Sequence, residues 1–234
     1  MISSEAKQEI CRAVSSACNS DVAGRGCSWR PASLRPMGRH RRGYPDCEDT
    51  KFMFDKILAR LGATLSESNL PYMIIGGQAV LLYGEPRLTR DIDITLGVGI
   101  DHLDALLQTI KKIPLRALPE DVAAFVKQTM VLPAIDESTG IRVDFIFSFI
   151  PYESQAINRA NHIRILGQDV FFARVEDLII HKIFSGRPRD MEDVRIILLK
   201  NQDIDTRYIE TWLMEFDAAA DEKIFLSAFR ALLK

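Results

Sequence analysis

The sequence predicts an α+β fold in which a mixed β-sheet is flanked by helices and followed by a helical C-terminal part. Short runs that are apolar or alternate with polar residues, at 72–75, 91–96 and 141–147, predict strands. Longer stretches with apolar residues at helical spacing lie between them, and beyond residue 175 only helical patterns occur. The 234 residues are 47% hydrophobic and 26% charged, which is ordinary for a globular chain and excludes fibrous and wholly disordered classes.

Residues 1–48 form a segment of different composition. Between residues 21 and 43 there are six arginines and one acid, Asp21, among many Gly, Ser and Pro residues. We expect a disordered basic extension, because such a segment buries too little apolar surface to offset its ordering entropy. One interpretation is an arm that binds RNA or DNA phosphates. The other, which we favour, is a solvated tail.

From residue 49 to 174 the patterns predict a mixed α/β core. A helix over 51–65 is followed by a strand at 72–75, a tight turn at Gly76-Gly77 and a helix at 78–83. Further along, the expected elements are a strand at 91–96, helices at 102–113 and 119–130, paired strands at 131–134 and 141–147, and a hairpin of 163–166 with 169–172 that turns at Gly167-Gln168. Residues 175–234 form the helical part, with helices at 175–184, 188–200, 206–216 and 221–233.

Three aspartates stand on two of these strands. Asp91 and Asp93 are two residues apart on a strand, so their side chains share one face with Cα atoms about 6.6–7 Å apart. Asp144 is a lone acid in an apolar strand, where an uncompensated carboxylate is costly. This pattern favours a site for one or two hard divalent cations. The alternative is that Asp91 and Asp93 form the exposed face of a half-buried strand.

Gly76-Gly77 stands between a strand and a helix. Glycines at such a junction let backbone N–H groups and the positive end of the helix approach an anion closely. Arg87 and Thr89, in the segment that leads to Asp91, are candidates for phosphate contacts. The alternatives are a plain tight turn and an arginine that pairs with neighbouring acids.

Together these residues resemble the nucleotidyltransferase superfamily with the DNA polymerase beta-type fold. Its signature is Gly-Gly or Gly-Ser, an Asp-x-Asp or Asp-x-Glu after about nine to thirteen residues, and a third acid on a later strand; here thirteen residues separate Gly77 from Asp91. The resemblance covers roughly residues 50–200. The run Arg87-Leu-Thr-Arg-Asp91-Ile-Asp93 more narrowly resembles bacterial abortive-infection (AbiE-type) toxin nucleotidyltransferases and their relatives.

A second block supports the narrower resemblance. A predicted helix carries Lys182, a short basic turn follows, and the next helix opens with Arg189-Asp190-Met-Glu-Asp193. The resemblance implies that Lys182 and Arg189 face nucleotide phosphates, while Asp190 and Asp193 order that basic pair or help the reaction. The alternative is ordinary helix capping, since acids in a first turn complement the helix dipole.

The resemblance implies a Mg²⁺-dependent nucleotidyltransferase that moves a nucleoside monophosphate from a nucleoside triphosphate to a hydroxyl acceptor. Asp91, Asp93 and Asp144 would be the catalytic metal ligands for two Mg²⁺ ions. Gly76, Gly77, Arg87, Thr89, Lys182, Arg189 and Asp190 would bind the nucleotide. A tRNA or protein acceptor, and a toxin–antitoxin or phage-defence setting with an antitoxin partner, are favoured over a small-molecule acceptor such as an aminoglycoside.

Two other function classes stay open. One is a catalytically silent nucleotide-binding or antitoxin-like module, and the other is RNA binding through the arginine-rich segment. The net charge of −2 argues against a chain that binds nucleic acid along its whole length. No run of about 18 apolar residues exists, so we expect no membrane association. All four cysteines lie in the first 47 residues and fit no zinc-ligand spacing, and we expect a reducing, cytoplasmic location.

Overall fold

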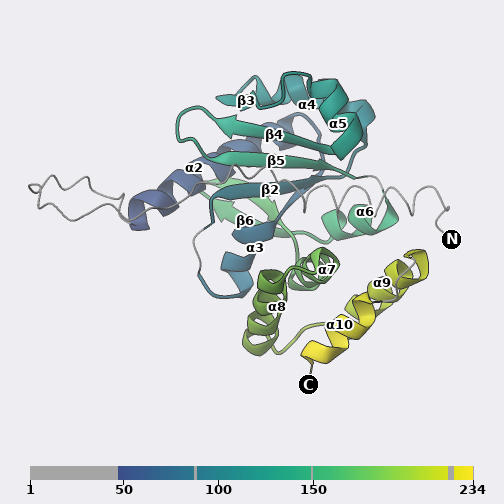
Figure 1. The fold of residues 1–234 in the computed structure, drawn as a ribbon. Coiled ribbons are helices and arrows are strands. Elements are labelled where there is room, and N and C mark those ends of the chain that lie inside the picture. Colours follow the sequence, from purple (N-terminus) through teal and green to yellow (C-terminus); the bar gives the residue numbers. More distant parts are fainter. Residues whose placement is uncertain (1–46, 87–88, 149, 221–223, 234) are drawn as a thin grey trace, which may run out of the picture.

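The protein is described from a computed structural model covering residues 47–86, 89–148, 150–220 and 224–233. These residues form a mixed seven-stranded sheet in the order β3-β4-β5-β2-β1-β7-β6, with helices around it (Figure 1). The C-terminal helices gather on the side of the molecule away from β3 and β4. The predicted α+β class is therefore confirmed. Residues 1–46 of the predicted basic extension 1–48 lie outside the described residues.

The strands are β1 (Tyr72–Ile75), β2 (Asp91–Leu96), β3 (Leu115–Ala117), β4 (Val131–Asp136), β5 (Arg142–Phe147), β6 (Asn161–Ile165) and β7 (Gln168–Phe172). The helices are α2 (Cys47–Glu67), α3 (Gly76–Tyr83), the short 3₁₀ helix η1 (Ile100–His102), α4 (Leu103–Ile110), α5 (Val122–Thr129), α6 (Pro151–Asn158), α7 (Val175–Ser185), α8 (Pro188–Lys200), α9 (Thr206–Ala219) and α10 (Phe225–Leu232).

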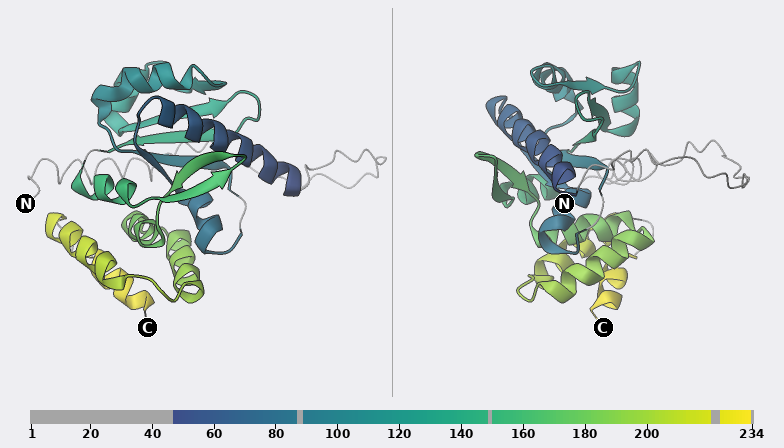
Figure 2. Two further views of the ribbon diagram at one scale, coloured as in Figure 1. Left: turned by 180° about the vertical axis from the view of Figure 1, so that it is seen from behind. Right: turned by 90° about the vertical axis from the view of Figure 1, so that its left-hand side faces the viewer.

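The centre of the sheet is built from β1, β2 and β5. β2 runs antiparallel to β1 and parallel to β5. On one face of β2 the side chains of Ile92, Ile94 and Leu96 are completely buried. The same face carries Tyr72 of β1, which lies against Gly62 of α2, and Figure 2 shows α2 crossing this side of the sheet. The apolar face of β2 therefore packs into the core, and its other face is left for polar side chains.

The structure differs from the sequence prediction in a few elements. Strand β3 and helix α6 were not predicted, and the helix expected over 102–113 is η1 followed by the shorter α4. The hairpin of β6 and β7 turns at Leu166-Gly167, one residue earlier than predicted, and both residues have positive φ values of 47° and 84°. Two successive residues with positive φ are the geometry that a two-residue hairpin favours.

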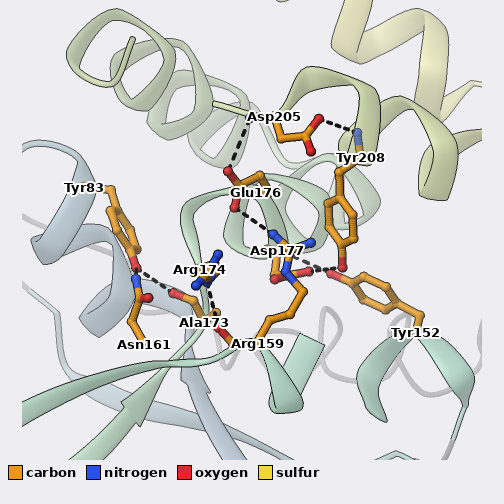
Figure 3. A network of polar contacts seen from close by, with 10 residues as sticks. All are labelled: Tyr83, Tyr152, Arg159, Asn161, Ala173, Arg174, Glu176, Asp177, Asp205 and Tyr208. Carbon is orange, nitrogen blue, oxygen red and sulfur yellow. Dashed lines mark hydrogen bonds and ion pairs between the residues drawn. The ribbon is translucent and has the colours of Figure 1, made fainter. Parts of the chain in front are cut away.

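A buried polar network attaches the C-terminal helices to the core (Figure 3). The Tyr208 hydroxyl of α9 donates to Asp177 Oδ1 at 2.8 Å, and the Tyr152 hydroxyl of α6 donates to the Asp177 carbonyl at 3.3 Å. Arg159 pairs with Glu176 at 3.3 Å and lies 3.7 Å above the Tyr208 ring. Burial raises the pKa of Asp177 to about 6, although the Tyr208 hydroxyl opposes the rise. The start of α7 is thus fixed between α6 and α9.

None of the helices within the described ranges is both long enough and apolar enough to cross a membrane.

Candidate active site

The three predicted carboxylates lie on one face of the sheet. Asp93 of β2 is directly opposite Asp144 of β5 in the parallel ladder, and Asp91 is opposite Arg142. Opposed residues on adjacent strands point to the same side, and strands are about 4.8 Å apart. Side chains alternate along each strand, so Asp91, Asp93 and Asp144 all project from the face opposite the buried Ile92 and Ile94.

Gly76 touches this cluster from the end of β1. Its neighbour Ile75 is paired with Asp93, and Gly76 itself has a φ of 62°, in the left-handed region that favours glycine. A Cβ atom at position 76 would lie only 1.9 Å from Asp93 Oδ2. The predicted turn residues Gly76 and Gly77 are in fact the first residues of α3. Glycine is therefore required at 76 both by backbone conformation and by the carboxylate beside it.

The pKa values of the cluster reflect the mutual repulsion of its carboxylates and their partial removal from water. The pKa of Asp93 is raised to about 7, chiefly by burial and then by the charges of Asp91 and Asp144, while Lys182 and Arg187 act in the opposite direction. Burial also raises the pKa of Asp144, against the opposing effect of Arg142. A buried group of like charges is stabilised by an added cation. The donor set, three carboxylates, suits a hard divalent ion.

The carboxylates are not already arranged around a metal position. Within the described residues, no group of three His, Cys, Asp or Glu side chains is placed to hold an ion as it stands. Arg142 explains part of this, because its Nε donates to Asp144 Oδ1 at 2.8 Å. The residue types and their shared face fit Mg²⁺, and the Asp144 side chain would have to leave Arg142 to take part.

Lys182 of α7 is held by two carboxylates of α8. Its Nζ lies 2.7 Å from Asp190 Oδ1 and 2.7 Å from Asp193 Oδ2, and its side chain is 5% exposed. Ser185 Oγ donates to the second oxygen of Asp190 at 2.6 Å. Burial acts to raise the pKa of Asp190, but Lys182, Ser185 and Arg187 together outweigh it and lower the pKa. Four residues of the predicted block thus form one polar cluster, Lys182, Ser185, Asp190 and Asp193, and the charge of Lys182 lowers the pKa of Asp93.

The other predicted nucleotide-binding residues have different positions. The Thr89 side chain is buried, and its hydroxyl accepts a 2.7 Å hydrogen bond from Gln78 Nε2, which ties the segment before β2 to α3. Gly77 is buried in α3, and Arg189 is exposed in the first turn of α8. Arg87 lies outside the described residues.

Sequence reasoning missed two charged residues of the site. Arg142 stands two residues before Asp144, and this spacing alone places both on one face of the strand. Arg187 occupies the N-cap position of α8, where its side chain makes no capping hydrogen bond, and its charge lowers the pKa of both Asp93 and Asp190. It stands in the basic turn, where Arg189 seemed the better candidate.

Several solved structures are similar to this chain. An antigenic nucleotidyltransferase-like protein from Paracoccidioides brasiliensis is 20% identical, with 74% of this chain and 92% of that chain covered and a TM-score of 0.46. ANT(2")-Ia in complex with adenylyl-2"-tobramycin is 20% identical, with 72% and 98% covered and a TM-score of 0.47. A CCA-adding enzyme is 16% identical, with 79% and 53% covered and a TM-score of 0.39.

No curated protein matches the sequence. The narrower resemblance to abortive-infection toxins therefore stays a prediction. A family model described as "Nucleotidyltransferase of unknown function (DUF6036)" matches residues 52–224, which is well over half of the chain and includes every residue of the candidate site. On this match the chain belongs to the DUF6036 family of nucleotidyltransferases.

Proposed function

We propose that the protein is a Mg²⁺-dependent nucleotidyltransferase that moves a nucleoside monophosphate from a nucleoside triphosphate to a hydroxyl acceptor. One observation carries the proposal: Asp91, Asp93 and Asp144 share one sheet face, with Asp93 opposite Asp144 and Gly76 against Asp93. Membership of the nucleotidyltransferase family supports the reaction class.

The three aspartates would hold Mg²⁺, and two ions are expected with the triphosphate. Bound Mg²⁺ would supply charge neutralisation at the phosphates and a lower pKa for the attacking hydroxyl. The Asp144 carboxylate would also accept the proton of the attacking hydroxyl. The acceptor oxygen then bonds to the α-phosphorus, and the bond from that phosphorus to pyrophosphate breaks.

The nucleotide would lie on the side of the triad that borders β1 and α3. Backbone N–H groups at Gly76 and Gly77, with the positive end of α3, would bind the triphosphate. Arg87, Lys182 and Arg189 would offset the charge that develops on the leaving pyrophosphate. Thr89 would act by holding its segment against α3 through Gln78, and Asp190 by orienting Lys182.

The acceptor and the biological setting are taken from the narrower resemblance and are part of the proposal. We favour an RNA or protein acceptor in the cytoplasm, in a toxin–antitoxin or phage-defence system with an antitoxin partner. A small-molecule acceptor on the same core is the alternative. Incubation of the protein with each α-labelled nucleoside triphosphate, Mg²⁺ and total cellular RNA or protein identifies the base and the acceptor together.

The test of the reaction is pyrophosphate release and label transfer by wild type, Asp93→Asn and Asp101→Asn. Asp101 is a matched control, because its side chain is 76% exposed on η1. Asp93→Asn should lose at least about a hundredfold in rate, the size of effect seen when one charge-stabilising group is removed. Asp101→Asn should keep the wild-type rate. Full activity of Asp93→Asn would remove the basis of the proposal.

A silent nucleotide-binding module is the second candidate function, and one contact favours it. Asp144 forms an ion pair with Arg142. The guanidinium balances the charge of the carboxylate, so Asp144 needs no metal ion. A silent module binds the triphosphate with the same affinity in wild type and Asp93→Asn and transfers no label to any cellular RNA or protein. The same incubations therefore distinguish it from the enzyme.

A further inference from the structure

β2 and β5 present four charged side chains as a two-by-two array. Asp91 faces Arg142 across the strands, and Asp93 faces Asp144. Three corners of the array are carboxylates and the fourth is a guanidinium. The proposed reaction uses the three acids and leaves Arg142 without a role.

Arg142 is paired inside the array and also reaches solvent. Its Nε lies 2.8 Å from Asp144 Oδ1, while its side chain is 38% exposed and that of Asp144 only 13%. The carboxylate is thus enclosed and the guanidinium has room to turn outward. Asp144 can therefore exchange Arg142 for another cation without movement of the β5 backbone.

A divalent ion and Arg142 compete for the same carboxylate. A guanidinium donates hydrogen bonds to carboxylate or phosphate oxygens and cannot lose its proton in a protein. When Asp91, Asp93 and Asp144 all bind the ion, Arg142 loses its carboxylate partner and lies beside a cation. An anionic group of an incoming molecule is then its favoured partner.

The position of Arg142 in the array indicates which incoming molecule carries this anionic group. β1 and the diglycine border β2 on one side, and β5 borders β2 on the other. If the triphosphate lies at the diglycine, as the proposed function has it, the acceptor approaches from β5, where Asp144 would take its proton. A guanidinium there attracts a phosphate next to the reacting hydroxyl and repels a polycationic acceptor such as an aminoglycoside.

We propose that Arg142 is a movable counter-ion that holds Asp144 in the metal-free protein and, once a divalent ion takes Asp144, pairs with a phosphate of a nucleic acid acceptor. Arg142 is then a positioning residue that couples ion binding to acceptor binding and selects the acceptor class. This inference rests on the proposed function, because it takes the triad as the ion site.

The experiment measures Mn²⁺ binding to the full-length protein by electron paramagnetic resonance. The variants are Arg142→Gln, Arg142→Lys, Asp93→Asn and the control Arg116→Gln, whose partner Glu137 lies outside the array and whose side chain is 59% exposed. Arg142→Gln should bind Mn²⁺ about two- to fivefold more tightly than wild type, the value of one part-exposed ion pair expressed as affinity. Arg116→Gln should match wild type. A purely structural role of Arg142 would weaken Mn²⁺ binding in Arg142→Gln.

The second arm measures the affinity of the same proteins for a short fluorescent single-stranded RNA, with and without Mn²⁺, by anisotropy. Wild type and Arg142→Lys should gain RNA affinity when Mn²⁺ is added, and Arg142→Gln should not. Asp93→Asn reports what Mn²⁺ does to the RNA alone. The basic segment 1–46 is present in every variant, so its contribution cancels. Circular dichroism confirms that each variant is folded.

The outcomes separate the two proposals. Mn²⁺ binding that is lost in Asp93→Asn but unchanged in Arg142→Gln overturns the counter-ion inference and leaves the proposed function standing. An equal Mn²⁺-dependent gain of RNA affinity in wild type and Arg142→Gln overturns the acceptor part. Mn²⁺ binding that is the same in wild type and Asp93→Asn overturns the ion site, and with it both proposals.

Discussion

Gly76→Ala tests the packing of the diglycine against the triad. The new methyl group would lie 1.9 Å from Asp93 Oδ2 and 2.8 Å from its Cγ. Asp93 lies on β2, which is hydrogen-bonded to strands on both sides, so the backbone cannot yield and the carboxylate must turn away. The substitution therefore displaces one oxygen of the triad without removing any charge.

The size of the effect follows from two separate costs. An alanine at a φ of 62° costs about 1–2 kcal/mol, because its Cβ is close to the following carbonyl oxygen. To reach an ordinary contact of 3.4 Å, Asp93 Oδ2 must move by about 1.5 Å, and a misplacement of about 1 Å can lower a catalytic rate about a hundredfold. The rate should therefore fall at least about a hundredfold.

Gly140→Ala is the matched control. Gly140 also has a positive φ, 74°, but a Cβ there meets nothing within 4 Å. Gly140→Ala should lose about 1–2 kcal/mol of unfolding free energy in urea denaturation and about 2–8 °C in Tm, and Gly76→Ala should lose at least as much. Only Gly76→Ala should lose pyrophosphate release and Mn²⁺ binding. If Gly76→Ala keeps both at the level of Gly140→Ala, Gly76 does not fix the triad and the reasoning is wrong.

Two further predictions concern buried charges. Lys182→Met should cost about 3–5 kcal/mol of unfolding free energy, because it leaves Asp190 and Asp193 without their shared cation; Lys200→Met, at an exposed pair with Glu85, should cost less than about 1 kcal/mol in the same denaturation. Burial raises the pKa of Glu153 from 4.5 to about 8, so the folded protein keeps a proton that the unfolded chain releases, and stability is lost as pH rises through this interval. Glu153→Gln should therefore gain a few kcal/mol over wild type between about pH 5 and about pH 9, and a constant difference across that range would contradict the assignment.

The strands and helices that carry the site could be predicted because each has a strong local pattern. β1 is four buried residues that end at a diglycine, and β2 alternates acids with fully buried isoleucines. α8 has Pro188 at its first position, where a missing N–H costs nothing. In these segments local preference and tertiary burial agree, and the sequence suffices.

β3 and α6 could not be predicted because tertiary contacts stabilise them. β3 is three residues long, with Arg116 exposed in the middle, and it exists through its pairing with β4. α6 buries both an aromatic residue, Tyr152, and an acid, Glu153, so it lacks a clear apolar face. Its position depends on Trp212 and Phe216 of α9, which contact Tyr152 from far along the chain.

The geometry of the triad depends on the register between β2 and β5, and apolar residues fix that register. Val143, Phe145 and Phe147 are completely buried on the face opposite Asp144. A slip of β5 by one residue would turn these three side chains to the polar face and bury Arg142 and Asp144 in the core. At about 1.5–3 kcal/mol for each large apolar side chain, such a slip would cost about 5–9 kcal/mol before the buried charges are counted. The core face of β5 thus determines which side chains meet Asp91 and Asp93, and the same constraint that brings Asp144 to them also brings Arg142.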